Sequence, residues 1–175
     1  SFLCGEVQIH RFILWYWRLL DGEDNFTAPV LDVHEFLANR GLSESFQQAL
    51  RPLPCTVAYH DACHMIHGQG IAAQPRDLLR AIPQLRLKEA TEAGVCCGSA
   101  GIYNLVQPDE AAELGQLKAD DLSSTGAEIV ASANIGCSLQ LRRYLSQDGP
   151  KVEHPMELLA RSAGVGPFSA TPSKS

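Results

Sequence analysis

Two adjacent cysteines before a glycine-rich stretch are the residues of this sequence best suited to chemistry, in Val95-Cys96-Cys97-Gly98-Ser99-Ala100-Gly101. Neighbouring cysteines rarely form a disulfide with each other, because that ring strains the intervening peptide. Soft thiolates suit iron-sulfur, copper(I) or zinc better than magnesium or calcium. We therefore interpret the pair as part of a metal centre. The alternative is two small hydrophobic residues buried in a core turn.

The composition indicates one globular domain with reduced thiols. The chain has 175 residues, of which 45% are hydrophobic and 19% charged, which suffices for one core but not for two large domains. The formal net charge of -6 makes nucleic acid an unexpected partner. Six unevenly spaced cysteines are too dilute for a disulfide scaffold, so a cytoplasmic location is expected. Charged residues interrupt the apolar run 2–20, which predicts no direct membrane span and no signal peptide.

The order of predicted elements indicates an α/β fold. Strands are expected at 55–60, 85–87, 128–132 and 151–153, and helices at 30–37, 43–50, 74–82, 102–106, 108–124, 138–146 and 155–163. This alternation predicts a mostly parallel sheet with helices on both faces. The predicted domain spans 25–163. Residues 1–24 form an unplaced N-terminal segment, and 164–175 are expected to be a disordered tail.

Four cysteines fall in the predicted loops that follow strands, namely Cys63, Cys96 with Cys97, and Cys137. In parallel sheets, ligands gather at the carboxyl ends of the strands, so we expect these thiols to converge at one edge of the sheet. Four thiolates match a [4Fe-4S] cluster and also a tetrahedral zinc site. The spacing leaves both open, because the chain has neither Cys-x2-Cys zinc knuckles nor a ferredoxin run.

Three histidines surround the first of these cysteines: His60, His64 and His67. Each could bind metal, relay protons, hydrogen-bond a cluster sulfur or have a structural role. His64 is the leading candidate for tuning the centre by a hydrogen bond without binding the metal, because it is adjacent to Cys63.

Other residues receive structural interpretations. Cys55 opens a strand and is expected in the core, and Cys4 receives no role. Asp61 either caps the turn before Cys63 or pairs with a histidine, and His154 is expected to fix the start of the last helix.

Four motifs together resemble a known family. They are Tyr59-His60-Asp61-Ala62-Cys63-His64, then Cys96-Cys97-Gly98-Ser99-Ala100-Gly101, Asn134-Ile135-Gly136-Cys137, and His154-Pro155-Met156-Glu157-Leu158-Leu159. They resemble the cysteine-rich (CCG) domain family, whose members include a heterodisulfide reductase component and iron-sulfur subunits of several dehydrogenases. Within it, the resemblance is greatest to the C-terminal part of glycolate oxidase (glycolate dehydrogenase) iron-sulfur subunits, over about residues 25–162.

This resemblance implies an iron-sulfur electron-transfer subunit of a flavin-dependent 2-hydroxy-acid dehydrogenase, oxidising glycolate to glyoxylate. It implies FAD on partner flavoprotein subunits, a quinone or another carrier as acceptor, and attachment to the inner membrane only through partners. The chain is not expected to be catalytic alone, since it has no flavin motif.

One position departs from the family pattern. The fullest family pattern ends in Cys-x2-Cys and supplies five thiolates to the cluster, whereas this chain has Gln140 at the last position. Four cysteines remain, enough for an ordinary cubane. The ferredoxin-like segment and the first cysteine-rich repeat that the resemblance implies are missing from this sequence, so a fragment or a truncated gene product is expected.

Three alternatives stay open. The chain could be a zinc-stabilised or metal-free interaction domain, or a heterodisulfide-reductase-like thiol/disulfide redox domain. In the third, Cys97 acts as a nucleophile assisted by a nearby histidine.

Overall fold

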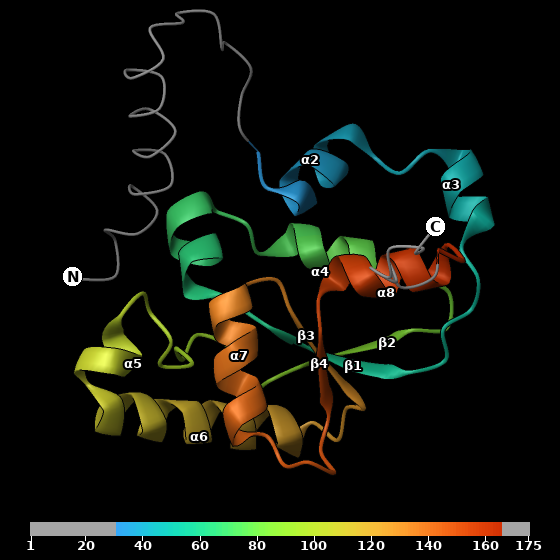
Figure 1. Ribbon diagram of the computed structural model, residues 1–175. Helices are drawn as coiled ribbons and strands as arrows, with labels where there is room; N and C mark the ends of the chain where they lie inside the picture. Colours follow the sequence, from blue (N-terminus) through green and yellow to red (C-terminus); the bar gives the residue numbers. More distant parts are fainter. Residues whose placement is uncertain (1–30, 166–175) are drawn as a thin grey trace, which may run out of the picture.

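A parallel four-stranded sheet is the centre of the fold. A computed structural model describes residues 31–165 (Figure 1). The strands are β1 (Thr56–His60), β2 (Arg86–Glu89), β3 (Ile129–Ser132) and β4 (Lys151–Glu153), in the spatial order β2-β1-β3-β4. Every neighbouring pair is parallel. The predicted parallel α/β fold is therefore confirmed.

Helices connect the strands and cover the sheet. They are α2 (Val33–Arg40), α3 (Glu44–Ala49), α4 (Ala73–Arg80), α5 (Tyr103–Val106), α6 (Pro108–Ser124), α7 (Ile135–Tyr144) and α8 (Pro155–Ser162), with a π-helical turn η1 at Met65–Gln69. Within residues 31–165, every helix is too short or too polar to span a lipid bilayer.

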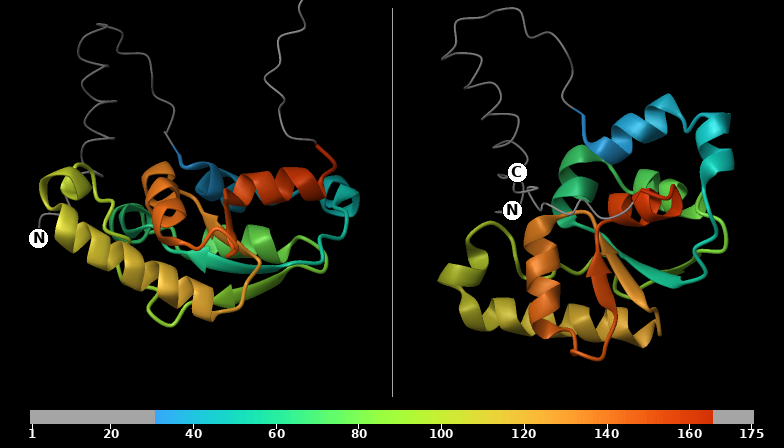
Figure 2. Two further views of the ribbon diagram at one scale, coloured as in Figure 1. Left: turned by 60° about the horizontal axis from the view of Figure 1, so that its bottom comes forward. Right: turned by 45° about the vertical axis from the view of Figure 1, so that its right-hand side comes forward.

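Side chains of the strands alternate between two hydrophobic cores. Val57 and Tyr59 of β1 join the core beneath α4 and α8, whereas Ala58 joins the core beneath α6 and α7. Figure 2 shows these two helical layers on opposite sides of the sheet. Because β1 is covered on both faces, all five of its residues are buried, as expected of a central parallel strand. The predicted two-sided covering is confirmed.

The strand order creates a topological switch point beside β1. The chain leaves β1 through α4 to reach β2 on one side, and returns through α6 to reach β3 on the other. His60 and Ser132, at the carboxyl ends of β1 and β3, are register partners. Crossovers on opposite faces leave a crevice outside such strand ends, which is where open α/β sheets bind ligands.

One predicted boundary was wrong in a way that affects the site. Residues 134–137 were predicted as a loop with the helix starting at Ser138, but α7 begins at Ile135 and Cys137 lies in its first turn. Asn134 is the N-cap, and its side-chain Oδ1 accepts a hydrogen bond from the Cys137 backbone N–H at 3.0 Å.

The predicted segment 1–24 lies outside the described residues, as does the predicted tail 164–175 beyond Val165. The boundaries of the domain therefore stay predictions.

Candidate metal centre

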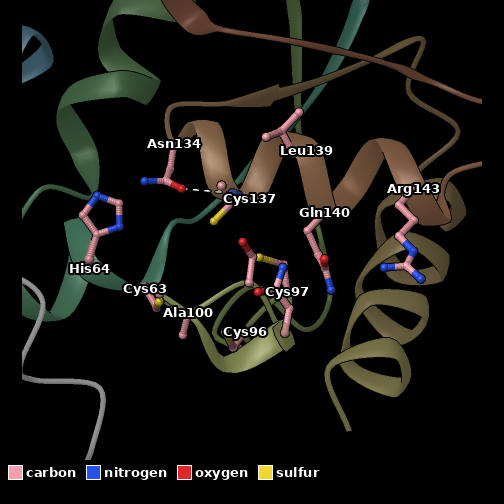
Figure 3. A pocket seen from close by; sticks show the side chains of 14 residues that line it. Cys63, His64, Cys96, Cys97, Ala100, Asn134, Cys137, Leu139, Gln140 and Arg143 are labelled. Atoms are coloured by element: carbon pink, nitrogen blue, oxygen red, sulfur yellow. Dashed lines mark hydrogen bonds between the residues drawn. The ribbon is translucent and has the colours of Figure 1, made fainter. Parts of the chain in front are cut away.

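A cavity of about 510 Å³ lies at the switch point between β1 and β3. All four cysteines of the predicted site line it, and Figure 3 shows them approaching it from separate parts of the chain. The other lining residues are His64, Ser99, Ala100, Gly101, Asn104, Asn134, Gly136, Leu139, Gln140 and Arg143. The structure thus brings the predicted thiols together at one edge of the sheet.

The cysteines come from three segments of the chain that follow strands. Cys63 follows β1 by three residues and precedes the π-helical turn. Cys96 and Cys97 lie in the long connection after β2, and Cys137 lies in the first turn of α7. Because free backbone N–H groups and the positive end of the helix dipole meet there, the start of α7 favours a thiolate at Cys137.

Gly98 allows the connection carrying the cysteine pair to press against α6. Its φ is +79°, which favours glycine, and a Cβ built there would lie 2.5 Å from the backbone oxygen of Ala111. The backbone N–H of Gly98 also donates to Cys96 Sγ at 3.4 Å. The glycine after the cysteine pair therefore has a steric role, since it lets Cys97 reach a position that is only 3% exposed.

The four thiols influence one another in series. A hydrogen bond with Cys96 raises the pKa of Cys63, while the same contact lowers the pKa of Cys96. The pKa of Cys97 is raised, chiefly by its hydrogen bond with Cys137. Conversely, the pKa of Cys137 is lowered, first by the Cys97 thiol and then, against the effect of burial, by His60. Cys96 and Cys137 are thus the thiolate partners, and a soft cation would deprotonate all four.

His60 also belongs to this group of side chains. It is the last residue of β1 and is 2% exposed, and neither ring nitrogen has a hydrogen-bond partner. Its ring nitrogen and the sulfurs of Cys97 and Cys137 all lie within 4.8 Å of one another. Sequence reasoning counted His60 among three candidates but preferred His64. His60 shares the face of Ala58, but the sequence carried no signal for this because every residue of β1 is buried.

The other polar candidates occupy the edge of the cavity or lie outside it. His64 lines the cavity beside Cys63 (Figure 3) and is half-buried, whereas His67 is exposed. Gln140, at the position of the family's fifth cysteine, is buried against α6, where its Nε2 donates to the backbone oxygen of Ala111 at 3.1 Å. Its amide nitrogen is therefore held by the protein.

Asp61 has neither of the two roles considered from the sequence. Its carboxylate accepts two hydrogen bonds from Arg76 of α4, at 2.8 and 2.7 Å. The same guanidinium binds Glu89 at the end of β2 and lies over the ring of Tyr59, 4.8 Å from its centroid. These contacts join β1, α4 and β2 at the carboxyl end of β1, so Asp61 fixes the strand end that leads to Cys63.

The donor set fits a centre of soft metal ions. Four thiols line the cavity, and the buried His60 imidazole lies within 4.8 Å of two of their sulfurs. Among the described residues that line the cavity there is no carboxylate. Sulfur donors suit an iron-sulfur cluster or zinc, whereas magnesium and calcium require oxygen ligands. Fold and site therefore define a parallel α/β domain with a candidate thiolate metal centre at its switch point.

The family of the domain follows from sequence comparison. Residues 57–142 match the CCG family, described as a cysteine-rich domain, and the chain belongs to this family. The matched range contains all four cysteines of the cavity. The predicted family is confirmed.

Relatives of this chain include larger redox proteins. One component of the fumarate reductase (CoM/CoB) of Methanothermobacter marburgensis is 35% identical over 133 residues, which are 74% of this chain and 26% of the relative. A probable glycolate oxidase iron-sulfur subunit of Bacillus subtilis is 34% identical over 115 residues, 63% of this chain and 26% of the relative. One component of the dihydromethanophenazine:CoB--CoM heterodisulfide reductase of Methanosarcina barkeri is 32% identical over 154 residues, 85% of this chain and 37% of the relative. The chain thus spans only 26–37% of the lengths of these relatives.

Proposed function

We propose that this domain binds an iron-sulfur cluster and transfers electrons within a larger oxidoreductase. The observation that carries the proposal is the convergence of Cys63, Cys96, Cys97 and Cys137 on one cavity at the switch point. In this proposal the four thiolates hold a [4Fe-4S] cluster. Such a cluster, when bound, accepts and donates single electrons.

The protein's own contribution is to hold the thiols and to set their surroundings. Cys97 and Cys137 are buried, so the side of the centre that they form is shielded from solvent. Cys63 and Cys96 are half-buried. Electrons therefore enter and leave on the side of Cys63 and Cys96, where the centre lies nearer to the surface. Backbone N–H groups at Gly98 and at the start of α7 stabilise negative charge on sulfur.

The finer proposal concerns the reaction served by the complex. The relative from Bacillus subtilis is named for glycolate oxidase, and other relatives are named for lactate utilisation. We infer a flavin-dependent 2-hydroxy-acid dehydrogenase that oxidises glycolate to glyoxylate. FAD lies on a partner flavoprotein subunit and a quinone is the acceptor. The location is cytoplasmic, with contact to the inner membrane through partners.

Exposed apolar side chains near the cavity support docking onto such a partner. On α7, Leu139 lines the cavity at 60% exposure, and Ile135 is 70% exposed. In and beside α5, Ile102, Leu105 and Val106 are exposed as well. Apolar surface at the opening of a redox site suits an interface that would bring a second centre close to the first.

The proposed function is tested by anaerobic reconstitution of the chain with iron and sulfide, followed by metal analysis and titration with photoreduced FAD. The expected result is about four iron ions per chain, visible absorbance that bleaches on reduction, and an EPR signal from the reduced cluster. Protein that takes up no iron, or whose bound iron cannot be reduced by the flavin, would refute it.

A second candidate is a structural zinc site, and one distance favours it. The ligand atoms of His60, Cys97 and Cys137 lie within 4.8 Å of one another, as around a single ion. The cavity of about 510 Å³ offers more space than one ion needs, which favours a cluster. Zinc bound in preference to iron, without visible absorbance, would favour the structural site.

A further inference from the structure

His60 is a buried histidine whose ring nitrogens have no hydrogen-bond partner within the described residues. Its side chain is 2% exposed, and both Nδ1 and Nε2 are without a hydrogen-bond partner. Burying a polar group without a partner costs free energy, because the group loses its hydrogen bonds to water. An orphaned polar group in a folded protein therefore points to a partner that arrives later.

The neighbours of His60 do not supply that partner. Its register partner on β3 is Ser132, whose hydroxyl donates to the backbone oxygen of Asn134. The side chain of Asp61, the next residue, is bound by Arg76. The sulfurs of Cys97 and Cys137 lie within 4.8 Å of a ring nitrogen of His60. A ring nitrogen without a partner therefore lies beside two thiols of the candidate metal centre.

A thiolate bound to a metal has no proton, so it can only accept a hydrogen bond. A neutral imidazole carries one N–H and can donate it. Either of the two nearby sulfurs, that of Cys97 or that of Cys137, can accept this hydrogen bond when it is bound to metal. Four thiolates complete the ligand number of a [4Fe-4S] cluster, so the imidazole is not needed as a ligand.

We propose that His60 donates a hydrogen bond to the sulfur of Cys97 or Cys137 in the loaded domain and thereby raises the reduction potential of the cluster. This role rests on the proposed function. Reduction adds negative charge to the cluster and its ligands, so a donor to the thiolate stabilises the reduced form more than the oxidised form. His60 is therefore a positioning and tuning residue that contacts a ligand without contacting metal.

The test compares His60→Leu and His60→Gln with wild type, and His67→Leu serves as an exposed control from the same segment. Leu has a similar bulk without polar atoms, whereas the Gln amide keeps an N–H donor. We expect all four proteins to bind the same amount of iron. In His60→Leu, the ratio of reduced to oxidised cluster at a fixed potential should fall roughly tenfold, a shift of about 59 mV for one electron. His60→Gln should restore most of this shift, and His67→Leu should show none.

The metal-free proteins provide a second, independent readout. Because His60 is unpartnered without the cluster, His60→Leu should unfold at the same temperature as wild type or higher. A lower unfolding temperature would instead identify a structural role and overturn the proposal.

The remaining outcomes separate this inference from the proposed function. Wild-type protein that takes up no iron refutes the proposed function and, with it, this role of His60. If wild type binds the cluster but His60→Leu keeps the wild-type potential, only the role of His60 is refuted. Loss of iron in His60→Leu would make His60 a ligand, which also overturns the donor role.

Discussion

Gly98 shows at the level of one residue why a glycine follows the cysteine pair. Its backbone has φ +79°, and the site of a Cβ is 2.5 Å from the backbone oxygen of Ala111. Backbone atoms of a helix cannot move aside as a flexible side chain would. Two separate effects therefore oppose any side chain here: the left-handed backbone conformation and the contact with α6.

We predict that Gly98→Ala destabilises the domain by about 3 kcal/mol, since strain of the left-handed backbone adds about 1–2 kcal/mol and overpacking at least as much again. Gly70→Ala is the matched control, because Gly70 has φ +71° with nothing within 4 Å of its Cβ site. It should cost only the strain, about 1–2 kcal/mol. Urea unfolding of the metal-free proteins measures both. Equal losses would show that contact with Ala111 is unimportant.

The residues of the site differed in how readily they could be predicted. The cysteines were identified because thiols have few roles in a reduced protein and because all four follow predicted strands. His60 was not preferred, because its importance depends on which face of β1 packs against the helices that bear Cys137. The face of a central strand cannot be read from its sequence when both faces are buried.

At the level of elements, the start of α7 was misjudged because of Gly136. A glycine suggests a loop, yet here it lies within the helix, and a Cβ on it would approach Ser99 Oγ to 3.0 Å. The glycine leaves room for a close tertiary contact between α7 and the loop after Cys97. The N-cap Asn134 was a local signal for the helix start that the glycine obscured.

The start of α8 was predicted correctly, and its capping residue is a histidine. His154 Nδ1 accepts a hydrogen bond from the Met156 backbone N–H at 3.1 Å, and the His154 backbone N–H donates to Glu157 at 2.7 Å. Burial lowers the pKa of His154, and the neighbouring His34 lowers it further. Both the cap and the surroundings favour the neutral ring.

This lowered pKa predicts that acid weakens the domain. A pKa below the usual 6.5 means that the unfolded chain binds the proton more readily, so the contribution of His154 is complete above about pH 6.5 and is lost as the pH falls through the folded pKa. The loss should reach about 1 kcal/mol, the value of a cap. His154→Asn keeps a capping oxygen without titrating. Urea unfolding at neutral and mildly acidic pH should therefore give a smaller acid loss for this variant, whereas equal losses would exclude His154 as the cause.

At the level of the whole molecule, topology explains how distant residues meet. The parallel alternation of strands and helices was evident from the sequence, and with it the expectation that the cysteine loops share one edge. The order β2-β1-β3-β4 was not predicted, although it determines that β1 and β3 are neighbours and that the crevice lies between their ends. The order depends on long-range packing between the two cores, which no local pattern encodes.

The topology also explains why the one other described cysteine lies away from the site. Cys55 is buried in the core on the opposite face from Cys97 and Cys137, as its predicted structural role requires. Its substitution therefore tests the effect of losing a buried thiol without touching the cavity.

The most direct test of the central claim is the iron content of five single cysteine-to-serine variants after anaerobic reconstitution. Serine replaces Cys63, Cys96, Cys97, Cys137 or, as the control, Cys55. Because four thiolates would each bind one iron of a [4Fe-4S] cluster, we predict that each of the first four variants loses most of its cluster iron and that Cys55→Ser keeps the wild-type amount. Wild-type iron in any of the four cavity variants, or equal loss in Cys55→Ser, would contradict a cluster held by these four thiols.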